Sequence, residues 1–198
     1  YSERREIIKI LTKLADAIRP SIPALIKANQ FLGTIDFIRA KAKLSITIDA
    51  CLPQISPNPG INLKNARHPL LQLRNKELGK HVVPLDVQLS VDNRILVISG
   101  PNAGGKSVSL KTIGLMQYMF QCGLLIPVSE DSEIYLFQQL FIDIGDEQSI
   151  ENDLSTYSSH LQGMCFFLEN ANTKTLFLID EFGTGTEPQF GGAIAEAV

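Results

Sequence analysis

The most informative stretch of this 198-residue sequence is a glycine-rich run that ends in a lysine and a serine. It has the spacing Gly-x4-Gly-Lys-Ser and lies between an apolar run at residues 95–98 and a predicted helix at residues 106–121. Glycines let a backbone wrap closely around a ligand with its N–H groups pointing inward, and a helix N-terminus adds partial positive charge. This combination is typical of a phosphate-binding loop. The run reads Gly100, Pro101, Asn102, Ala103, Gly104, Gly105, Lys106 and Ser107.

The last two residues of the run indicate what kind of phosphate ligand to expect. Lys106 is placed to reach the outer phosphates of a nucleoside triphosphate, and the Ser107 hydroxyl can bind Mg²⁺. The competing interpretation is an ordinary glycine-rich turn, which the succession of strand, loop and helix disfavours. We therefore expect ATP and Mg²⁺ as cofactors and a Mg²⁺-dependent ATPase activity.

Two adjacent carboxylates follow a second apolar run, at residues 175–179. That run predicts a buried strand, and strand alternation sends neighbouring side chains in different directions, so the two acids can have different tasks. We expect Asp180 to join the Mg²⁺ shell and Glu181 to orient or deprotonate the attacking water. The alternative is a pair of solvated acids at a strand end, which a phosphate loop whose Lys106 lies 74 residues earlier disfavours.

An Asp-Glu pair at this point is typical of ATPases of the ABC type, in which a second subunit completes each active site. There, a helix N-terminus with hydroxyl side chains reaches the γ-phosphate from across the dimer. Ser155 lies 25 residues before Asp180 and, with Thr156, opens a predicted helix that continues to about Asn170. The pair would supply hydroxyls, N–H groups and the helix dipole. An ordinary helix N-cap explains the same residues equally well, so both interpretations stay open.

Strands and helices alternate along most of the chain, which predicts an α/β fold of the P-loop type with a mainly parallel sheet flanked by helices. Strict alternation at residues 83–91 indicates a half-buried strand, and a proline near its start favours an edge position. Residues 95–98 indicate a fully buried strand, and residues 134–144 one or two strands. Gly123 is expected to stop the helix that follows the phosphate loop, and Pro188 to start a last helix.

A helical arm is predicted at residues 1–45, ahead of an ABC-type ATPase domain at residues 46–198. Apolar residues at helical spacing define the arm, with charged residues opposite them. Pro20 and a second proline three residues later should interrupt or kink it. Gly33 should break it, so that Thr34 can cap a further helix.

The charge is distributed unevenly. Residues 1–48 hold nine Lys or Arg and four Asp or Glu, a net charge of +5, whereas the remainder holds nine and seventeen, a net charge of −8. The acidic remainder argues against nucleic-acid binding by this part of the chain alone. The basic first segment is interpreted as a solvated helix face, with a contact to nucleic acid as the alternative.

Hydropathy and the positions of the cysteines limit the class of protein. Hydrophobic residues make up 44% and charged residues 20% of the chain, and no apolar run reaches the roughly 18 residues that a membrane span needs. Cys51, Cys122 and Cys165 are far apart and have no metal-binding spacing. We therefore expect buried, reduced thiols in a cytoplasmic protein that has no contact with membranes.

Three further stretches, at residues 65–71, 140–150 and 154–160, carry distinctive sequence motifs. Together they resemble the MutS family, and residues 32–42 and 180–188 resemble its second bacterial subfamily. The match covers nearly the whole chain. That subfamily suppresses recombination and is linked to the rescue of stalled ribosomes. The resemblance therefore implies a homodimeric ATPase that couples its ATP state to clamping on branched DNA or on ribosomes.

The resemblance also implies roles for individual residues. Residues 100–107, together with Val108, would bind the phosphates, and residues 183–187 would let the two subunits sense each other. Residues 145–148 would lie near the metal and the γ-phosphate. Val83 would lie near the adenine, in a place where the family often has an aromatic residue, so stacking on the base should be weak.

Several other interpretations fit parts of the sequence. Both ends of the sequence read as interrupted helices, so we expect a fragment, with the clamp and a C-terminal nuclease domain encoded outside it. One alternative is a classical mismatch-recognition MutS ATPase. A transporter-type ABC ATPase is disfavoured because only 47 residues separate Ser107 from Ser155. A small-molecule kinase is disfavoured by the absence of Lys and Arg between Thr112 and Thr173, and a nucleotide-binding module without turnover is the last alternative.

Overall fold

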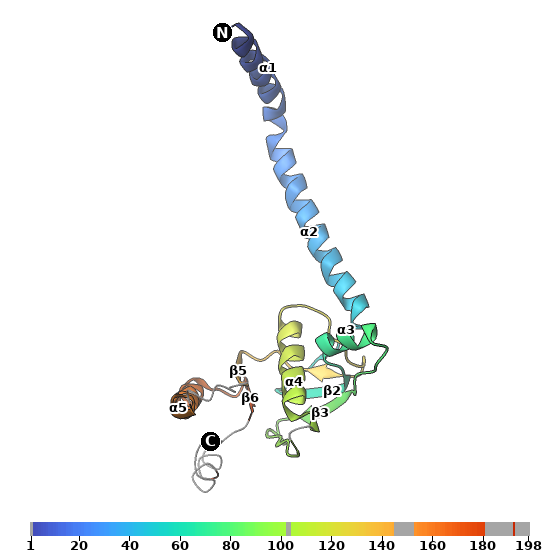
Figure 1. Cartoon of the computed structure of the whole chain (residues 1–198), viewed down its shortest axis with the longest axis vertical. Coiled ribbons are helices and arrows are strands. Elements are labelled where there is room, and N and C mark those ends of the chain that lie inside the picture. The colour runs from blue at the N-terminus through green and yellow to red at the C-terminus, as the bar shows by residue number, and fades with distance from the viewer. Residues whose placement is uncertain (1, 102–103, 145–152, 181–191, 193–198) are drawn as a thin grey trace. The chain divides into compact units, whose positions relative to one another are not determined.

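The computed structural model describes residues 2–101, 104–144, 153–180 and 192, with the side chains of residues 153–161 left out. The chain divides into two compact units, Tyr1–Leu44 and Ser45–Val198, which are considered separately (Figure 1). Within the described residues, no helix combines the length and the apolar character needed to cross a bilayer.

The first unit is helical. It consists of α1 (Ser2–Ile18), a 3₁₀ turn (Arg19–Ser21) and most of α2 (Ile22–Thr47). The predicted interruption at Pro20 is confirmed by the 3₁₀ turn, whereas the predicted break at Gly33 is wrong because α2 continues through it. A helical glycine costs only about 1 kcal/mol relative to alanine, which a helix of this length absorbs. Thr34 caps nothing, since its Oγ1 donates to the Gln30 carbonyl at 3.0 Å inside the helix.

The second unit begins with a mixed four-stranded sheet. Its strand order is β1-β4-β2-β3, with β1 parallel to β4 and β2 antiparallel to both of its neighbours. β3 lies at an edge of this sheet, as the proline before it predicted. The strands are β1 (Gln54–Ile55), β2 (Ile61–Ala66), β3 (Leu85–Leu89) and β4 (Glu133–Ile134).

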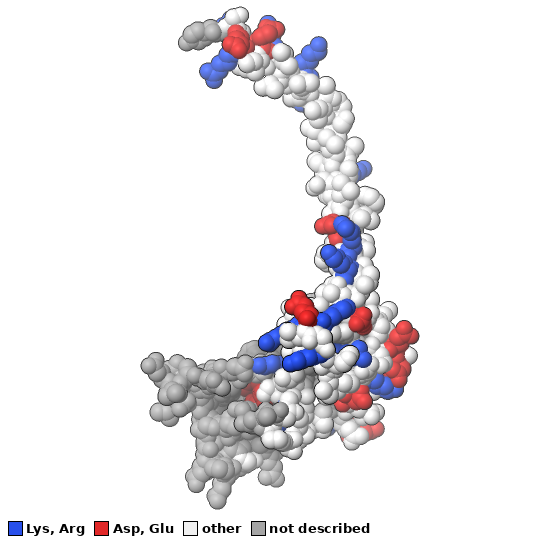
Figure 2. All heavy atoms as spheres, turned by 45° about the vertical axis from the view of Figure 1, so that its right-hand side comes forward, with Lys and Arg blue, Asp and Glu red and all other residues white. Residues whose placement is uncertain are grey.

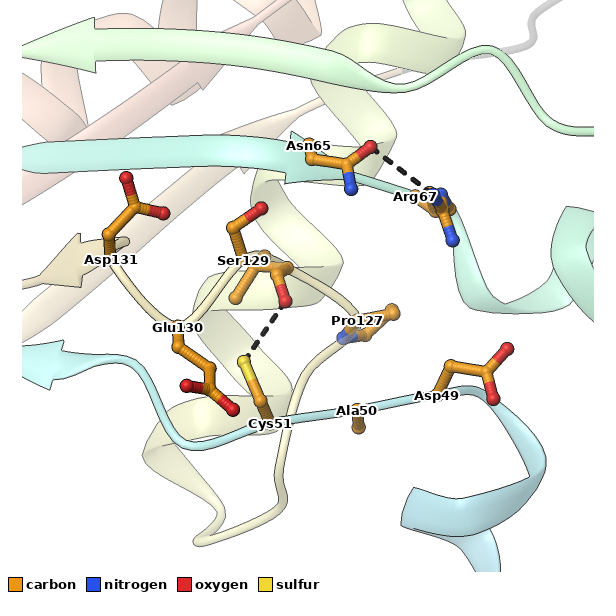
Figure 3. A pocket seen from close by; sticks show the side chains of 10 residues that line it. Asp49, Ala50, Cys51, Asn65, Arg67, Pro127, Ser129, Glu130 and Asp131 are labelled. Atoms are coloured by element: carbon orange, nitrogen blue, oxygen red, sulfur yellow. Dashed lines mark hydrogen bonds between the residues drawn. The ribbon is translucent and has the colours of Figure 1, made fainter.

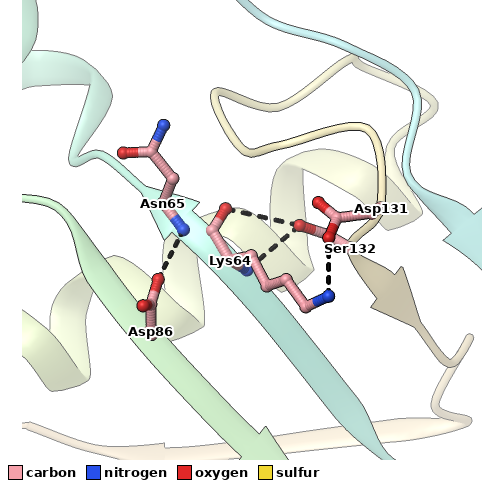
Figure 4. Close-up of polar contacts among 5 residues, drawn as sticks. All are labelled: Lys64, Asn65, Asp86, Asp131 and Ser132. Atoms are coloured by element: carbon pink, nitrogen blue, oxygen red, sulfur yellow. Dashed lines mark hydrogen bonds and ion pairs between the residues drawn. The ribbon is translucent and has the colours of Figure 1, made fainter.

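Polar contacts hold the central strand β2 to the segments beside it (Figure 4). Asn65 has a left-handed backbone, with a φ of 53°, and its N–H donates to a carboxylate oxygen of Asp86 at 2.6 Å. On the other side, the Lys64 N–H donates to Oγ of the buried Ser132 at 3.0 Å. The Lys64 ammonium also pairs with Asp131 at 2.5 Å. These contacts fix the place where β2 leaves the sheet and the chain turns toward α3 (Pro69–Glu77).

One apolar cluster holds the second unit together. α4 (Lys106–Gln121) contributes Met116, which is fully buried, and β2 and β4 contribute Ile61 and Ile134, which are 1% and 0% exposed. Gln117 is buried in the same helix, and its amide donates to the Tyr135 carbonyl at 2.8 Å. The helix ends as predicted before Gly123, whose φ of 71° suits glycine.

A parallel strand pair completes the second unit. β5 (Gln139–Asp143) pairs in register with β6 (Thr175–Ile179), and α5 (Asp153–Asn170) connects them. Phe141 of β5 stacks on Phe167 of α5, with ring centroids 4.7 Å apart. The prediction of one or two strands at residues 134–144 is confirmed as two, because β4 and β5 both fall there.

Two expectations about strands are wrong in the described residues. Two of the four strand pairings are antiparallel, so the sheet structure is mixed rather than mainly parallel. Residues 95–98 form no strand, and Ile95 and Val97 are 86% and 81% exposed. An apolar run becomes a buried strand only where a neighbouring strand accepts its backbone, and no described strand pairs with this one. The predicted helix at Pro188 lies outside the described residues.

Candidate nucleotide-binding site

The glycine-rich run forms a loop that leads directly into α4. Gly100 and Gly105 have φ values of 149° and 85°, in a region that other residues rarely adopt. Gly105 is the N-cap of α4 and provides no side-chain cap. The N–H groups of the first helical turn have no acceptor within the helix, so they are a natural anion-binding surface.

Lys106 folds back over this loop. Its ammonium donates to the Gly100 carbonyl at 2.6 Å, which links the first helical residue to the start of the run. Within the loop, the Gly104 N–H donates to the Pro101 carbonyl at 2.9 Å. These two contacts bring the described residues on either side of the run together, beside a cation and the start of a helix. Such a site suits phosphate oxygens.

An acidic edge lies where β5 and β6 end. The parallel register places Asp143 opposite Ile179, and the Asp180 N–H donates to the Asp143 carbonyl at 2.9 Å. Two partly buried aspartates therefore follow one another at the same carboxyl edge of the strand pair. Asp143 was not among the predicted site residues, because its place beside Asp180 depends on a strand register that sequence spacing does not give.

Packing connects the phosphate loop with this acidic edge. α4 contacts β6, and a Cβ added at Gly114 would lie 2.8 Å from Cδ1 of Leu178. A side chain at this position would therefore make the Leu178 side chain shift. In Figure 1, α4 begins and β6 ends at the same side of this packed pair. The start of the helix and the end of the strand thus lie at a common end of the fold.

The remaining predicted site residues divide into two groups. Val83 is described, and it is 87% exposed in the segment before β3. Ser155 is the third residue of α5, which begins at Asp153 and not at Ser155 as predicted, and its side chain is outside the described set. Asn102, Ala103 and Glu181 also lie outside the described residues. Ser107 and Val108 lie in the first turn of α4, with Ser107 partly buried and Val108 44% exposed.

A cavity of about 620 Å³ lies elsewhere in the same unit (Figure 3). It is polar, and none of the predicted nucleotide-binding residues lines it. Triphosphate sites are built largely from backbone N–H groups at a helix start, so the loop, and not this cavity, is the candidate nucleotide site. The cavity is lined by Asp49, Ala50, Cys51, Asn65, Arg67, Pro127, Val128, Ser129, Glu130 and Asp131.

The cysteines differ from expectation in their burial. All three are free thiols, but only Cys51 is partly buried, whereas Cys122 and Cys165 are exposed. Burial raises the pKa of the Cys51 thiol, and the nearby Glu130 carboxylate raises it further. The thiol donates a hydrogen bond to the Val128 carbonyl at 3.0 Å. The thiol therefore remains protonated and unreactive at neutral pH.

The buried environment of His68 links its protonation to the stability of the fold. It is the N-cap residue of α3, and its Nδ1 is buried without a hydrogen-bond partner among the described residues. Burial lowers the pKa of His68, and the positive charge of Lys111 lowers it further. The neutral imidazole is thus the form that the fold accommodates.

Comparison with known proteins gives the family of the chain. Residues 96–198 match the family model of MutS domain V. Among curated proteins, the chain is 46% identical over 196 residues to Endonuclease MutS2 of Finegoldia magna and 46% identical over 197 residues to that of Carboxydothermus hydrogenoformans. It is 44% identical over 196 residues to Endonuclease MutS2 of Lactobacillus acidophilus. Each match covers 99% of this chain and 24% of the relative, so the chain spans about a quarter of the length of these relatives.

The family match begins at residue 96, just before the phosphate loop, and includes α4, β5, α5 and β6. The similarity to the MutS2 proteins extends over both units, the helical arm included. The resemblance inferred from short stretches of sequence is thereby confirmed at the level of the family. The chain belongs to the MutS family, and within it is similar to the MutS2 proteins.

Proposed function

We propose that this chain is the ATP-binding and ATP-hydrolysing part of a MutS-like DNA-processing protein. The observation that carries this proposal is the start of α4, where glycines with positive φ, a helix N-terminus without a side-chain cap and the Lys106 ammonium converge. MutS domain V is the ATPase part of MutS proteins, and the match to it includes this loop.

The residues of the loop and the acidic edge fit a magnesium–triphosphate. Lys106, now held by the Gly100 carbonyl, would exchange that acceptor for the outer phosphate oxygens. Ser107 and Asp180 would hold Mg²⁺, which when bound neutralises charge on the phosphates. Glu181 would orient the attacking water and accept its proton. Together these groups would balance the negative charge of the phosphates and position the attacking water.

Three further residues have supporting roles in the proposal. Val108 extends the turn whose N–H groups bind phosphate, and Val83 lies near the adenine as an exposed aliphatic contact. Ser155 of the partner subunit reaches the γ-phosphate from the start of its α5. The complete site then requires a homodimer that forms through the ATPase domains.

Nucleotide state would control the rest of the protein through this dimer. ATP joins two ATPase domains and hydrolysis releases them, which is a two-state switch. We propose that the switch closes a clamp on branched DNA or on stalled ribosomes, in the cytoplasm, through parts outside these residues. The relatives are named endonucleases. We assign ATP chemistry, and not strand cleavage, to the residues of this chain.

ATP binding and hydrolysis by the intact protein test the proposal. Lys106→Ala should weaken ATP binding by about 100-fold, because a charge-assisted contact to the phosphates is lost. Glu181→Gln should bind ATP but hydrolyse it about 100-fold more slowly, and dimers should accumulate. Lys111→Ala, which removes a positive charge from the same helix, serves as the matched control and should change neither property.

Two results would contradict parts of this assignment. Unchanged ATP affinity in Lys106→Ala would remove the phosphate loop from the site. Unchanged hydrolysis in Glu181→Gln would leave the loop in place but show that another group activates the water.

A further inference from the structure

Positive charge is concentrated in one short segment of the second unit. From Ser45 onward the chain carries nine Lys or Arg and seventeen Asp or Glu. Five of those nine basic residues fall within residues 64–81, together with a single acidic residue, Glu77. This segment therefore has a net charge of +4 inside a unit that is otherwise strongly acidic. It consists of the end of β2, helix α3 and the loop that follows.

Three of these cations are exposed and close together in the chain. Arg74 and Lys76 occupy the last turn of α3, and Lys80 lies in the loop that follows. Gly79 precedes Lys80 and turns the chain back with a φ of 62°. The Lys80 N–H then donates to the Asn75 carbonyl at 2.9 Å. None of the three forms an ion pair with any residue in the described part of the chain. In Figure 2, Lys and Arg side chains lie near one another on one face of the second unit, with acidic side chains beside them. We call Arg74, Lys76 and Lys80 the α3 basic surface.

Two other basic residues of the segment are already engaged. The Lys64 ammonium forms an ion pair with the Asp131 carboxylate at 2.5 Å, so its positive charge is already balanced. Arg67 lines the polar cavity, and its guanidinium donates to the Asn65 side chain at 3.4 Å. The α3 basic surface is thus the part of the segment whose charges are directed to solvent.

The shape of the α3 basic surface indicates the size of its ligand. None of its three residues lines the cavity in the described part of the unit, and all three are exposed on a helix end and the loop after it. A small anion would be bound weakly on such an open surface, because water competes with each contact. An extended polyanion with charges at regular intervals can engage several exposed cations together and releases counterions when it does.

We propose that the α3 basic surface binds the phosphodiester backbone of nucleic acid, so that the ATPase unit itself contacts the substrate that the clamp encloses. This inference rests on the proposed function only in taking nucleic acid as the substrate. It differs from the expectation, drawn from overall charge, that this part of the chain does not bind nucleic acid alone. Backbone contacts of this kind position a protein on nucleic acid without reading its sequence.

The test is the salt dependence of nucleic-acid binding by the intact protein. Fluorescence anisotropy with a duplex DNA and a duplex RNA of the same sequence would be measured between about 50 and 200 mM salt. For the triple variant Arg74→Ala, Lys76→Ala, Lys80→Ala, the slope of log affinity against log salt on DNA should become shallower by about 2 to 3. A loss on both duplexes, or on one alone, supports the surface and identifies which backbone it binds.

Two control variants separate a contact from a general effect of charge. The triple variant Lys64→Ala, Arg94→Ala, Lys174→Ala removes the same charge elsewhere in the unit and should leave the slope nearly unchanged. The charge-conserving variant Arg74→Lys, Lys76→Arg, Lys80→Arg should bind as the wild type does. This charge-conserving variant still tests the role of the positive charges if the alanine variant is less stable than the wild type.

Two outcomes would overturn the inference. One is equal loss in the two alanine variants. The other is an unchanged slope with a lower melting temperature, which would mean that the basic residues only stabilise the C-terminal end of α3. ATP binding measured on the same samples distinguishes the two proposals. A normal ATP affinity with an unchanged slope refutes the nucleic-acid surface alone, whereas absent ATP binding in the wild type refutes the proposed function.

Discussion

The phosphate loop and the acidic edge meet the same ligand in our account, but the fold builds them in different ways. The loop is local, since consecutive residues, two positive φ angles and one lysine contact define it. The acidic edge is assembled from strands 36 residues apart, and it exists only because β5 and β6 pair in register, as the Gln139–Thr175 pair shows. The spacing of residues along the chain is enough to define the loop. The position of the acids at the edge depends on how the two strands pack.

This difference predicts two classes of defect. A substitution in the loop should abolish ligand binding while the fold survives. A substitution at the contact between α4 and β6 should damage the fold and the acidic edge together, although it lies away from every phosphate-binding residue.

The largest effect is expected at Gly114. Gly114→Val would place a Cβ 2.8 Å from Cδ1 of Leu178, so this side chain, which is only 5% exposed, must shift within the core. The free energy of unfolding should fall by about 1–3 kcal/mol, and Mg²⁺-dependent ATP binding should weaken with it. Urea denaturation and ATP titration of the same variant measure both.

Gly163 in α5 offers the matched control. A Cβ added there meets nothing within 4 Å, so Gly163→Ala should raise stability by up to about 1 kcal/mol through helix propensity alone. A destabilised Gly163→Ala, or a Gly114→Val variant as stable as the wild type, would show that the close approach of α4 to β6 is not what the glycine is for.

A smaller effect on stability is expected in the loop. Gly105→Ala places a Cβ at a φ of 85°, which costs about 1–2 kcal/mol if the conformation is retained. At Gly104 the φ is not positive and a Cβ would lie 3.6 Å from Cγ of Pro101, which is an ordinary contact. Gly104→Ala should therefore keep its melting temperature. Both variants should bind ATP more weakly, because each Cβ crowds the approach of phosphate to the backbone.

The smallest effect concerns His68, which belongs to neither half of the site. Because burial holds the pKa of His68 below its ordinary value of 6.5, the unfolded chain takes up this proton at a higher pH than the folded one. Stability should therefore be unaffected by His68 above about pH 7 and should decrease as the pH falls below 6.5. His68→Asn should flatten this decrease in urea midpoints measured between pH 5 and 8. An identical pH dependence in that variant would exclude the histidine as its source.

The elements with strong local signals could be predicted from sequence. The helix at Lys106–Gln121 and the strand at Thr175–Ile179 have the predicted bounds, because glycine punctuation and a short apolar run define them locally. The stop at Gly123 and the edge position of β3 also follow from single residues, a glycine with positive φ and a proline without an N–H.

The errors arise where neighbours decide the outcome. Gly33 lies within α2 because the surrounding helix formers outweigh one glycine. Residues 95–98 are as apolar as β6, yet they form no strand among the described residues because burial needs a partner that composition does not supply. Asp143 joins Asp180 through strand register, and Arg74, Lys76 and Lys80 gather within an acidic unit, which an overall charge count conceals.

The most direct test of the central claim is a double-mutant cycle between the loop and the acidic edge. ATP affinity would be measured with Mg²⁺ and with EDTA for Ser107→Ala, Asp180→Asn and the double variant of the intact protein. If both groups hold one Mg²⁺, each single variant loses most of the Mg²⁺-dependent gain and the double variant loses no more, a coupling of about 1–3 kcal/mol. Losses that simply add, or a full Mg²⁺ response in Asp180→Asn, would contradict a site shared by the loop and the edge.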